Sequence, residues 1–383
     1  MVSIGIILLI IIILFAIYRL TRRIYPQIHV NANGKVVPII SKMGSLKQPY
    51  RPTPWLIGTH MQTMYGMRFR KKHLNYRREI FTFDDKGQCA LDFYEPIENV
   101  NLTKSGNSIN DSQEFSSNPP ILLIIHTLGG GTREPCSNNL AEAARLRGYR
   151  SLIYNNRGCS GVPFTSRRFY NASQDDDVKD VIHYLKAKYN PPQFFLVGFS
   201  LGAYMAALFD TDEGQILDGV ALVSHSYDGN GSNEVLKTGF LNRKFYLPFM
   251  MQKVIHLFSK NHFIVDQYKD VMNAKTLDEY DMLYTCKEYG IKDVYEYYDE
   301  HSLKKRVPFF KAPTFVLGAD NDPFTLKKYM PIKVIEQSEY CAFVHVAEGG
   351  HVSFPTGLRA EKSYIELVVL DFFDTIIKMQ NTI

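Results

Sequence analysis

The chain has 383 residues, of which 45% are hydrophobic and 22% are charged, and its formal net charge is +5. This composition can bury a large core and excludes a mostly disordered protein. The charge is modest for the length and no basic motif interleaved with aromatic residues accompanies it, so we do not expect nucleic acid as a partner. The five cysteines have neither metal-site spacing nor an even disulfide framework, which indicates reduced thiols and no metal.

Residues 1–20 are predicted to form a single-pass transmembrane anchor. Residues 1–18 carry no charged side chain, and about 18 apolar residues are what a bilayer span needs. There is no basic leading region and no small-residue cleavage site, which favours a signal-anchor over a cleaved signal peptide. Arg19, Arg22 and Arg23 follow the apolar run. By the positive-inside rule, we expect the catalytic domain to face the cytosol from the endoplasmic reticulum or another endomembrane.

Four Asn-x-Ser/Thr triplets favour the opposite orientation. They begin at Asn101, Asn110, Asn171 and Asn230, and they could be glycosylated only in a lumenal domain. Such triplets arise readily in an Asn-rich chain, so we keep the cytosolic orientation as the expectation.

Beyond the anchor, we expect a linker over residues 21–72 and one catalytic domain over residues 73–383. Strands are predicted over 79–83, 89–94, 120–126, 151–155, 194–198, 217–224, 313–318 and 342–347. Helices are predicted over 139–147, 176–188, 201–209 and 361–379. After a first hairpin, strands alternate with helices. This alternation predicts an α/β fold with a mostly parallel eight-stranded sheet that is covered by helices on both faces.

Two segments interrupt the alternation. Residues 103–118 are rich in Ser and Asn, which predicts a solvated insertion. Residues 227–307 are dense in aromatic and aliphatic side chains, and we interpret them as a helical lid. Most of these side chains should pack against the domain, while a subset lines an acyl pocket.

The pentapeptide Gly198-Phe199-Ser200-Leu201-Gly202 is the strongest functional signal. It lies between a predicted strand and a small-residue helix, as in the nucleophile elbow of a serine hydrolase. The flanking glycines permit a sharp turn and a close approach of helix to strand. A serine hydroxyl is a weak nucleophile and needs a base, so the sequence should also supply a histidine.

That histidine is predicted to be His351, in the loop after the last strand. An acid should orient it, and Asp320 and Asp322 both follow the preceding strand. We favour Asp322 because Pro323 stiffens its turn, whereas Asp320 can serve as a turn residue. The chain order Ser, Asp, His is the one expected of α/β-hydrolases.

Two backbone N–H groups are predicted to stabilise the oxyanion. One belongs to Leu201, directly after the nucleophile. The other lies in the loop after the strand at 120–126, where we assign Leu128, with Thr127 and Gly129 as alternatives. His126, in the same loop, is interpreted as structural.

The acidic run Asp175-Asp176-Asp177 is interpreted as the start of a helix rather than a metal site. Apolar residues follow it at helical spacing, Ser173 is placed to cap the helix, and acids favour a helix N-terminus.

Five motifs together resemble the membrane-anchored α/β-hydrolase-domain proteins, a family of monoacylglycerol lipases, medium-chain phospholipases and alcohol acyltransferases. They are Gly58-Thr59-His60-Met61-Gln62-Thr63, Asn156-Arg157-Gly158-Cys159, the elbow pentapeptide, Asn321-Asp322-Pro323-Phe324 and Gly349-Gly350-His351. The resemblance covers roughly residues 50–375. It implies that Ser200 is the nucleophile, Asp322 the acid and His351 the base. The chain departs from the family at Thr127, at Ala203, and at His225-Ser226-Tyr227-Asp228, which replaces a more usual Pro-containing turn.

The sequence therefore predicts a serine carboxylester hydrolase that cleaves acylglycerol, phospholipid or fatty-acyl esters at a membrane and needs no cofactor. The nearest alternative is alcohol acyl transfer by the same triad. A membrane-anchored binding protein without activity is the alternative of another class.

Overall fold

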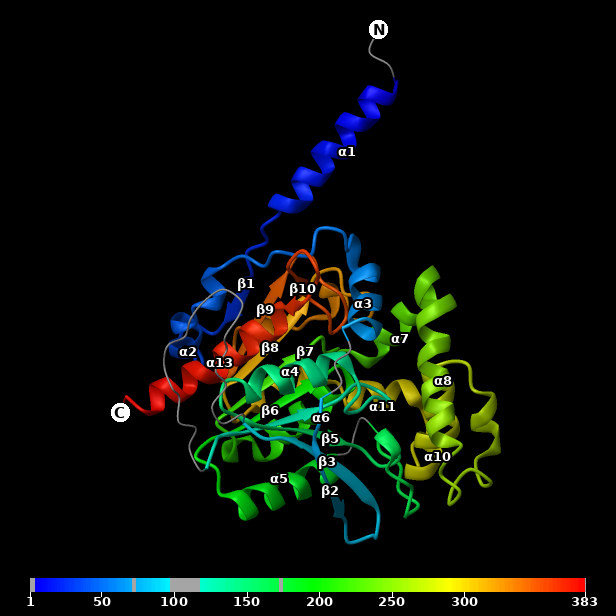
Figure 1. Ribbon diagram of the computed structural model, residues 1–383. Helices are drawn as coiled ribbons and strands as arrows, with labels where there is room; N and C mark the ends of the chain where they lie inside the picture. The colour runs from blue at the N-terminus through cyan, green and yellow to red at the C-terminus, as the bar shows by residue number, and fades with distance from the viewer. Residues whose placement is uncertain (1–3, 71–73, 97–117, 172–174, 383) are drawn as a thin grey trace.

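A nine-stranded sheet organises the protein (Figure 1). We describe it from a computed structural model, in which residues 4–70, 74–96, 118–171 and 175–382 are placed well enough to describe. The strand order is β1-β9-β8-β7-β6-β4-β5-β3-β2. Strands β4 to β9 are mutually parallel, while β1, β2 and β3 are antiparallel to their neighbours. The α/β hydrolase architecture with a mostly parallel sheet is therefore present.

The strands are β1 Gln27–Val30, β2 Arg77–Thr82, β3 Gln88–Tyr94, β4 Ile121–Ile125, β5 Arg150–Asn155, β6 Phe194–Phe199, β7 Gly219–Val223, β8 Thr314–Ala319 and β9 Cys341–Val346, with the short pair β10 Pro355–Thr356 and β11 Lys362–Ser363 apart from the sheet. The helices are α1 Ile4–Thr21, α2 Val37–Lys42, α3 Gly58–Arg68, α4 Pro135–Arg145, α5 Asp176–Tyr189, α6 Leu201–Glu213, α7 Gly229–Thr238, α8 Leu247–Phe258, α9 Leu277–Tyr280, α10 Cys286–Tyr289, α11 Val294–Glu300, α12 Ile332–Ile335 and α13 Tyr364–Gln380.

The prediction of eight strands was wrong by one edge strand. All eight predicted strands are present, but β1 pairs with β9 at the edge of the sheet, with Gln27 opposite His345 and Val30 opposite Ala342. It has only four residues, exposed at its first half. So short a segment cannot show a clear period of two, and its partner lies more than 300 residues away.

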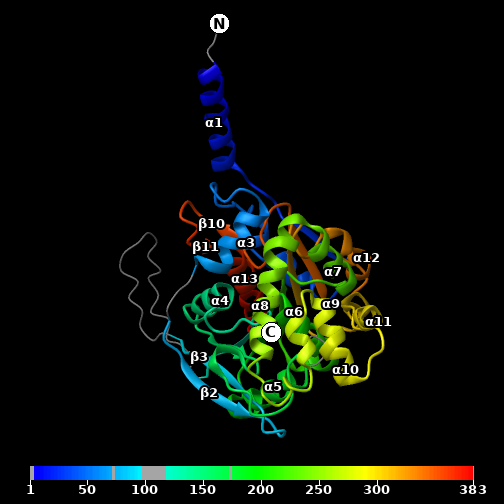
Figure 2. The ribbon, with the colours of Figure 1, turned by 90° about the vertical axis from the view of Figure 1, so that its right-hand side faces the viewer.

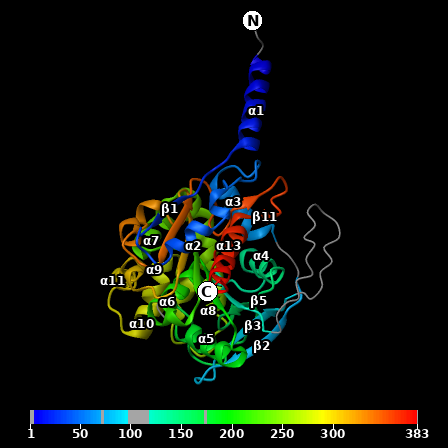
Figure 3. The same cartoon turned by 90° about the vertical axis from the view of Figure 1, so that its left-hand side faces the viewer.

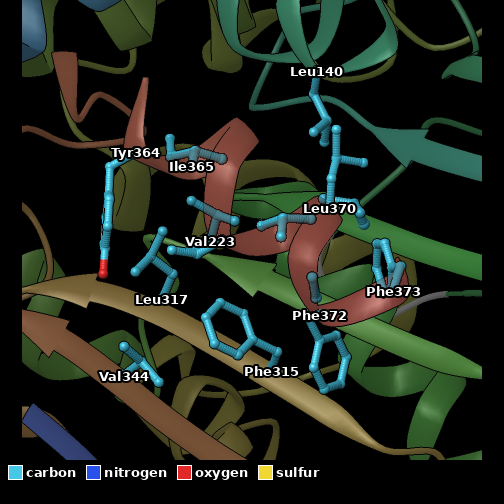
Figure 4. Close-up of a cluster of buried hydrophobic side chains, with 14 of the residues drawn as sticks. Leu140, Val223, Phe315, Leu317, Val344, Tyr364, Ile365, Leu370, Phe372 and Phe373 are labelled. Atoms are coloured by element: carbon cyan, nitrogen blue, oxygen red, sulfur yellow. The ribbon is translucent and has the colours of Figure 1, made fainter. Parts of the chain in front are cut away.

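Helices cover both faces of the sheet, as predicted. Helices α4 and α13 lie on one face (Figure 3), and α5 and α6 lie on the other. Figure 4 shows side chains of α13 against the strands, where the rings of Phe372 and Phe315 stack at 5.4 Å. Buried aromatic side chains of this size contribute strongly to the hydrophobic effect. The central strands are thus held rigidly, together with the loops at their carboxyl ends.

Some predicted boundaries shifted. Helix α4 begins at Pro135, four residues before the prediction, because proline is favoured in the first helical turn. Helix α13 begins at Tyr364 rather than at 361, since Ser363 caps it by accepting the N–H of Ile365. Ser173 and nearly all of the predicted insertion at 103–118 lie outside the described residues. The N-cap residue of α5 is Asp175.

Residues 227–307 are predominantly helical, and their role as a lid stays a prediction. They run from the end of β7 to β8 and contain α7 to α11. Figure 2 shows these helices gathered on the side of the body that faces the viewer. Residues of this segment line a cavity together with Ser200, which follows β6.

Helix α1 projects away from the body, and most of its side chains are exposed apolar groups (Figure 1). Nevertheless, no helix in the described parts of the chain is long and apolar enough to cross a membrane, so the transmembrane helix expected over residues 1–20 is not found there.

Ion pairs and hydrogen bonds of two arginines connect the end of α1 to the rest of the protein. Arg19 is buried, donates to the carbonyl oxygens of Pro54 and Leu56, and forms an ion pair of 3.2 Å with Glu348. Arg22 binds the other oxygen of Glu348 at 2.8 Å. Glu348 lies three residues before His351, in the loop after β9. These ion pairs therefore hold the first part of the loop that carries His351.

Candidate active site

Ser200 lies in a sharp turn between β6 and α6. Its backbone has a φ of 53° and a ψ of −113°, a strained conformation for a residue with a side chain, and its N–H donates to the carbonyl of Val223 at 3.0 Å. The two flanking glycines are required by close packing. A Cβ at Gly198 would lie 2.3 Å from the Cα of Ala203, and one at Gly202 would lie 2.4 Å from the carbonyl oxygen of Ile125. The elbow geometry inferred from the pentapeptide is therefore present.

His351 and Asp322 complete a hydrogen-bonded chain with Ser200. The Nε2 atom of His351 is 2.8 Å from the Oγ of Ser200, and its Nδ1 is 3.0 Å from the Oδ2 of Asp322. Both side chains are buried. An Nδ1–H that donates to the carboxylate leaves the Nε2 lone pair facing the serine hydroxyl. This is the arrangement that a general base needs.

The backbone around the triad is held by side chains from distant segments. Thr63, in α3, accepts the N–H of His351 at 2.9 Å, and Ser224 accepts the N–H of Val352 at 2.9 Å. Asp322 accepts the N–H groups of Phe324 and Thr325 at 2.8 and 3.1 Å, which orients its carboxylate.

Asp320, the alternative acid, faces a different histidine. Its Oδ1 is 2.5 Å from the Nδ1 of His345, and its Oδ2 is 3.5 Å from the ammonium of Lys327. The structure brings Asp322, and not Asp320, to His351, as the choice from the sequence anticipated.

The loop after β4 reduces the three oxyanion candidates to one. The N–H of Thr127 donates to Glu134 at 3.1 Å, and the N–H of Gly129 donates to the Tyr170 hydroxyl at 3.0 Å. Leu128 has no such partner for its N–H among the described residues, and it lines the cavity that contains Ser200. Leu201 is the first residue of α6, so its N–H has no partner within the helix. The geometry thus favours the predicted pair, Leu128 and Leu201.

His126 has the structural role suggested by its position. Burial lowers its pKa, so the ring is neutral. Its Nδ1 donates to the carbonyl of Thr127 at 2.6 Å, and its Nε2 accepts the N–H of Asn156 at 3.3 Å. Both nitrogens are therefore engaged in holding the loop.

The acidic run at the start of α5 forms ion pairs. Asp177 binds the buried guanidinium of Arg157 at 2.6 Å, Asp176 binds Arg168 at 2.8 Å, and Asp175 lies 3.2 Å from Lys179. Within the described residues, no group of three potential metal ligands comes together. These carboxylates have structural partners, in keeping with the helix-start interpretation.

Comparison with known proteins agrees with the fold. The model of the alpha/beta hydrolase fold family matches residues 120–358. The chain belongs to the alpha/beta hydrolase family. The bovine protein named "Phospholipase ABHD3" is 26% identical over 342 residues, which cover 86% of this chain and 79% of that protein. The yeast (Saccharomyces cerevisiae) protein named "Monoacylglycerol lipase" is 25% identical over 350 residues, which cover 81% and 77%.

A solved structure, described as a 2,6-dihydroxy-pseudo-oxynicotine hydrolase, superimposes with a TM-score of 0.51 at 14% identity, over 79% of this chain and 68% of that one. It supports the hydrolase fold alone. Together with the family match and the relatives, the prediction of a carboxylester hydrolase of the lipase and esterase group is confirmed at this level.

This alpha/beta hydrolase has two chambers lined in part by residues 227–307. One, of about 230 Å³, is lined by Ser200 and His351, and a second, of about 220 Å³, shares Leu128, Leu201 and several lid residues with it. A larger pocket of about 870 Å³ lies on the other side of the oxyanion loop, along Gly129–Gly131 and α8. The two smaller chambers are mainly apolar and adjoin the nucleophile.

Sequence reasoning missed several residues that hold the site. Glu134 and Tyr170 bind the oxyanion loop, and Thr63 and Ser224 hold the histidine loop. Thr63 ends the motif Gly58–Thr63, so that resemblance could have suggested a role for it. Tyr170 and Ser224 lie 41 and 128 residues from their partners, and Glu134, seven residues from Thr127, carries no local pattern, so only the tertiary structure reveals them.

Proposed function

We propose that this hydrolase cleaves lipid esters through an acyl-enzyme on Ser200. The observation that carries the proposal is the continuous hydrogen-bonded chain from the Ser200 hydroxyl through His351 to Asp322. The relatives named as a phospholipase and a monoacylglycerol lipase support a lipid substrate.

In the first half of the reaction, Ser200 attacks the ester carbonyl carbon while its proton moves to the Nε2 of His351. The N–H groups of Leu128 and Leu201 bind the oxyanion that forms. Asp322 keeps the imidazole in the required tautomer and stabilises the imidazolium. Collapse of the tetrahedral intermediate breaks the bond to the alcohol oxygen, which takes the proton from His351 and leaves as the free alcohol.

In the second half, a water molecule gives a proton to His351 and attacks the acyl carbon. The second tetrahedral intermediate expels the Ser200 oxygen, which recovers the proton from His351. The fatty acid is released and the enzyme is restored. No cofactor or metal is required in this proposal.

The chambers beneath the lid suit an acyl chain. Leu128, Leu201, Leu236 and Leu277 line both of them, and Met250 adds an adaptable wall beside Ser200. Transfer of a hydrocarbon chain from water to a cavity with apolar walls of this kind is favourable.

We further propose that the protein works at a membrane surface, on its cytosolic side. Helix α1 presents exposed apolar side chains along its length, and the exposed Arg23 lies just beyond this run, where it can meet lipid head groups. A vesicle flotation assay tests this association. The wild-type protein should float with the vesicles, and a variant with polar residues in place of the apolar side chains of α1 should not.

The test of the function is release of fatty acid by the purified protein from vesicles that contain monoacylglycerol or phospholipid. We expect release by the wild type and none above background by Ser200→Ala. Adding a short alcohol separates the two enzymatic alternatives. New alkyl ester in place of fatty acid would favour acyl transfer, and no release or transfer by a folded wild type would favour the binding protein without activity.

A further inference from the structure

One wall of the Ser200 chamber is built from the segment that follows β7. His225 and Tyr227 of this segment line the chamber together with Ser200 and His351. His225 is only 3% exposed, and its ring lies between the rings of Tyr204 and Tyr227, at centroid distances of 5.7 and 5.0 Å. The imidazole is therefore fixed in place beside the nucleophile.

The protonation of His225 follows from its surroundings. Burial, with a smaller contribution from the nearby His351, lowers its pKa to about 3, so the ring is neutral. A hydrogen bond to the backbone of Ser200 acts in the opposite direction, as expected when a ring N–H donates to a carbonyl oxygen. A neutral imidazole has only one N–H. The other nitrogen is a bare acceptor.

That second nitrogen, Nε2, is buried and has no hydrogen-bond partner among the described residues. Two further polar atoms of the same chamber share this condition, the hydroxyls of Tyr227 and Thr325, whose residues are 1% and 5% exposed. Most buried polar groups in proteins are hydrogen-bonded, and those that are not call for an explanation. Each of these three atoms belongs to a residue that lines the chamber next to the reacting serine.

We propose that this wall binds a hydroxyl group of the lipid ester, with the Nε2 of His225 as the acceptor. This inference rests on the proposed ester hydrolysis. Because His225 adjoins both Ser200 and His351, the hydroxyl is carried within a few bonds of the ester. It belongs either to the alcohol, as in a partial glyceride, or to the acyl chain near its carbonyl. A site built to bind a hydroxyl rejects the analogue that lacks it, since its polar groups are then left unpaired.

The experiment compares two pairs of esters that differ by hydroxyl groups. One pair is 1-octanoyl glycerol and propyl octanoate, and the other is methyl 3-hydroxyoctanoate and methyl octanoate. The ratio of kcat/KM within each pair is measured for the wild type, His225→Phe and Tyr204→Phe. Because both members are assayed on the same preparation, loss of folded protein cancels. Tyr204 is a matched control, since it lines the same chamber but its hydroxyl already donates to the carbonyl of His301.

We expect the wild type to favour the hydroxyl-bearing ester of one pair by about tenfold or more, and that pair identifies which part of the substrate carries the hydroxyl. His225→Phe should remove about tenfold of this preference, while Tyr204→Phe should keep it. The inference is overturned if the wild type shows no preference in either pair, or if the preference survives in His225→Phe. Water would then be the partner of these polar atoms.

Failure of the proposed function is a separate result, because the wild type would then hydrolyse neither member of either pair. Should His225→Phe not fold, Tyr227→Phe takes its place, since it removes one oxygen atom from the same wall. An unchanged ratio in that variant overturns the inference equally.

Discussion

The two sides of the Ser200 chamber differ in how their polar groups are satisfied. On the catalytic side, His351 has a partner at each ring nitrogen, and Asp322 accepts two backbone N–H groups besides the imidazole. On the side formed by the segment after β7, His225 and Tyr227 each have a buried polar atom without a partner among the described residues. The first side is organised before substrate arrives, and the second is completed by what binds.

The difference has a physical reason. Catalytic groups gain most when their dipoles are fixed in advance, because no reorganisation is then needed in the transition state. A group that selects a substrate must instead keep a hydrogen-bond donor or acceptor without a partner until the correct ligand binds. Two buried histidines close to one serine therefore have opposite tasks.

The largest effect is expected from removal of the nucleophile or the base. Ser200→Ala and His351→Ala should each lower kcat on a soluble ester by about 10⁶-fold, since members of a triad act as a unit. Steady-state kinetics with circular dichroism as the folding control measures this. Activity within tenfold of the wild type in either variant would contradict the assignment of Ser200 as nucleophile and His351 as base.

A smaller but sharper effect separates the two acids. Asp322→Asn should lower kcat by about 10⁴-fold, because the imidazole then adopts the wrong tautomer. Asp320→Asn is its matched control, since Asp320 contacts His345 and Lys327 instead. Its kcat should stay within a few fold of the wild type, and the reverse ranking would transfer the acid role to Asp320.

His225, in the wall with unpaired polar atoms, should lower the stability of the protein in acid. The folded-state pKa of His225 is about 3, below the ordinary 6.5, so the unfolded chain binds the proton first and stability falls as the pH drops below 6.5. Between pH 7 and pH 5, the wild type should lose about 2 kcal/mol more than His225→Phe. Urea unfolding at both pH values measures this difference. Equal losses would mean that His225 is solvated.

Asp210 and Asp281 act in the opposite direction, since burial raises the pKa of each to about 6 and their contribution falls as the pH rises from 4 to 6. Both residues are present in the wild type and in His225→Phe. Their effects therefore cancel in the comparison.

The smallest predicted effect concerns the outer edge of the histidine loop. Glu348→Gln leaves the buried Arg19 without its charged partner, which should cost about 1–3 kcal/mol of unfolding free energy. Glu339→Gln is the control, because its pair with Lys35 is well exposed and should contribute little. Thermal unfolding of the two variants measures the contrast, and equal midpoints would mean that α1 is not tied to the loop.

The catalytic side could be predicted from the sequence because its signals are local. A strand, a serine turn and a helix follow one another at Gly198–Gly202, and the acid and the histidine each follow a strand. The choice of Leu128 could be made only loosely, since Glu134 and Tyr170 take up the neighbouring N–H groups through tertiary contacts. The open wall gave no signal beyond the departure at His225, because the lack of a partner is a property of the folded chamber.

The most direct test of the central claim is labelling of the purified protein with a fluorophosphonate, followed by peptide mass spectrometry. The account predicts one adduct on Ser200 in the wild type and in Asp320→Asn, and none in Ser200→Ala or His351→Ala. A folded wild type that does not react, or an adduct on another residue, would contradict it.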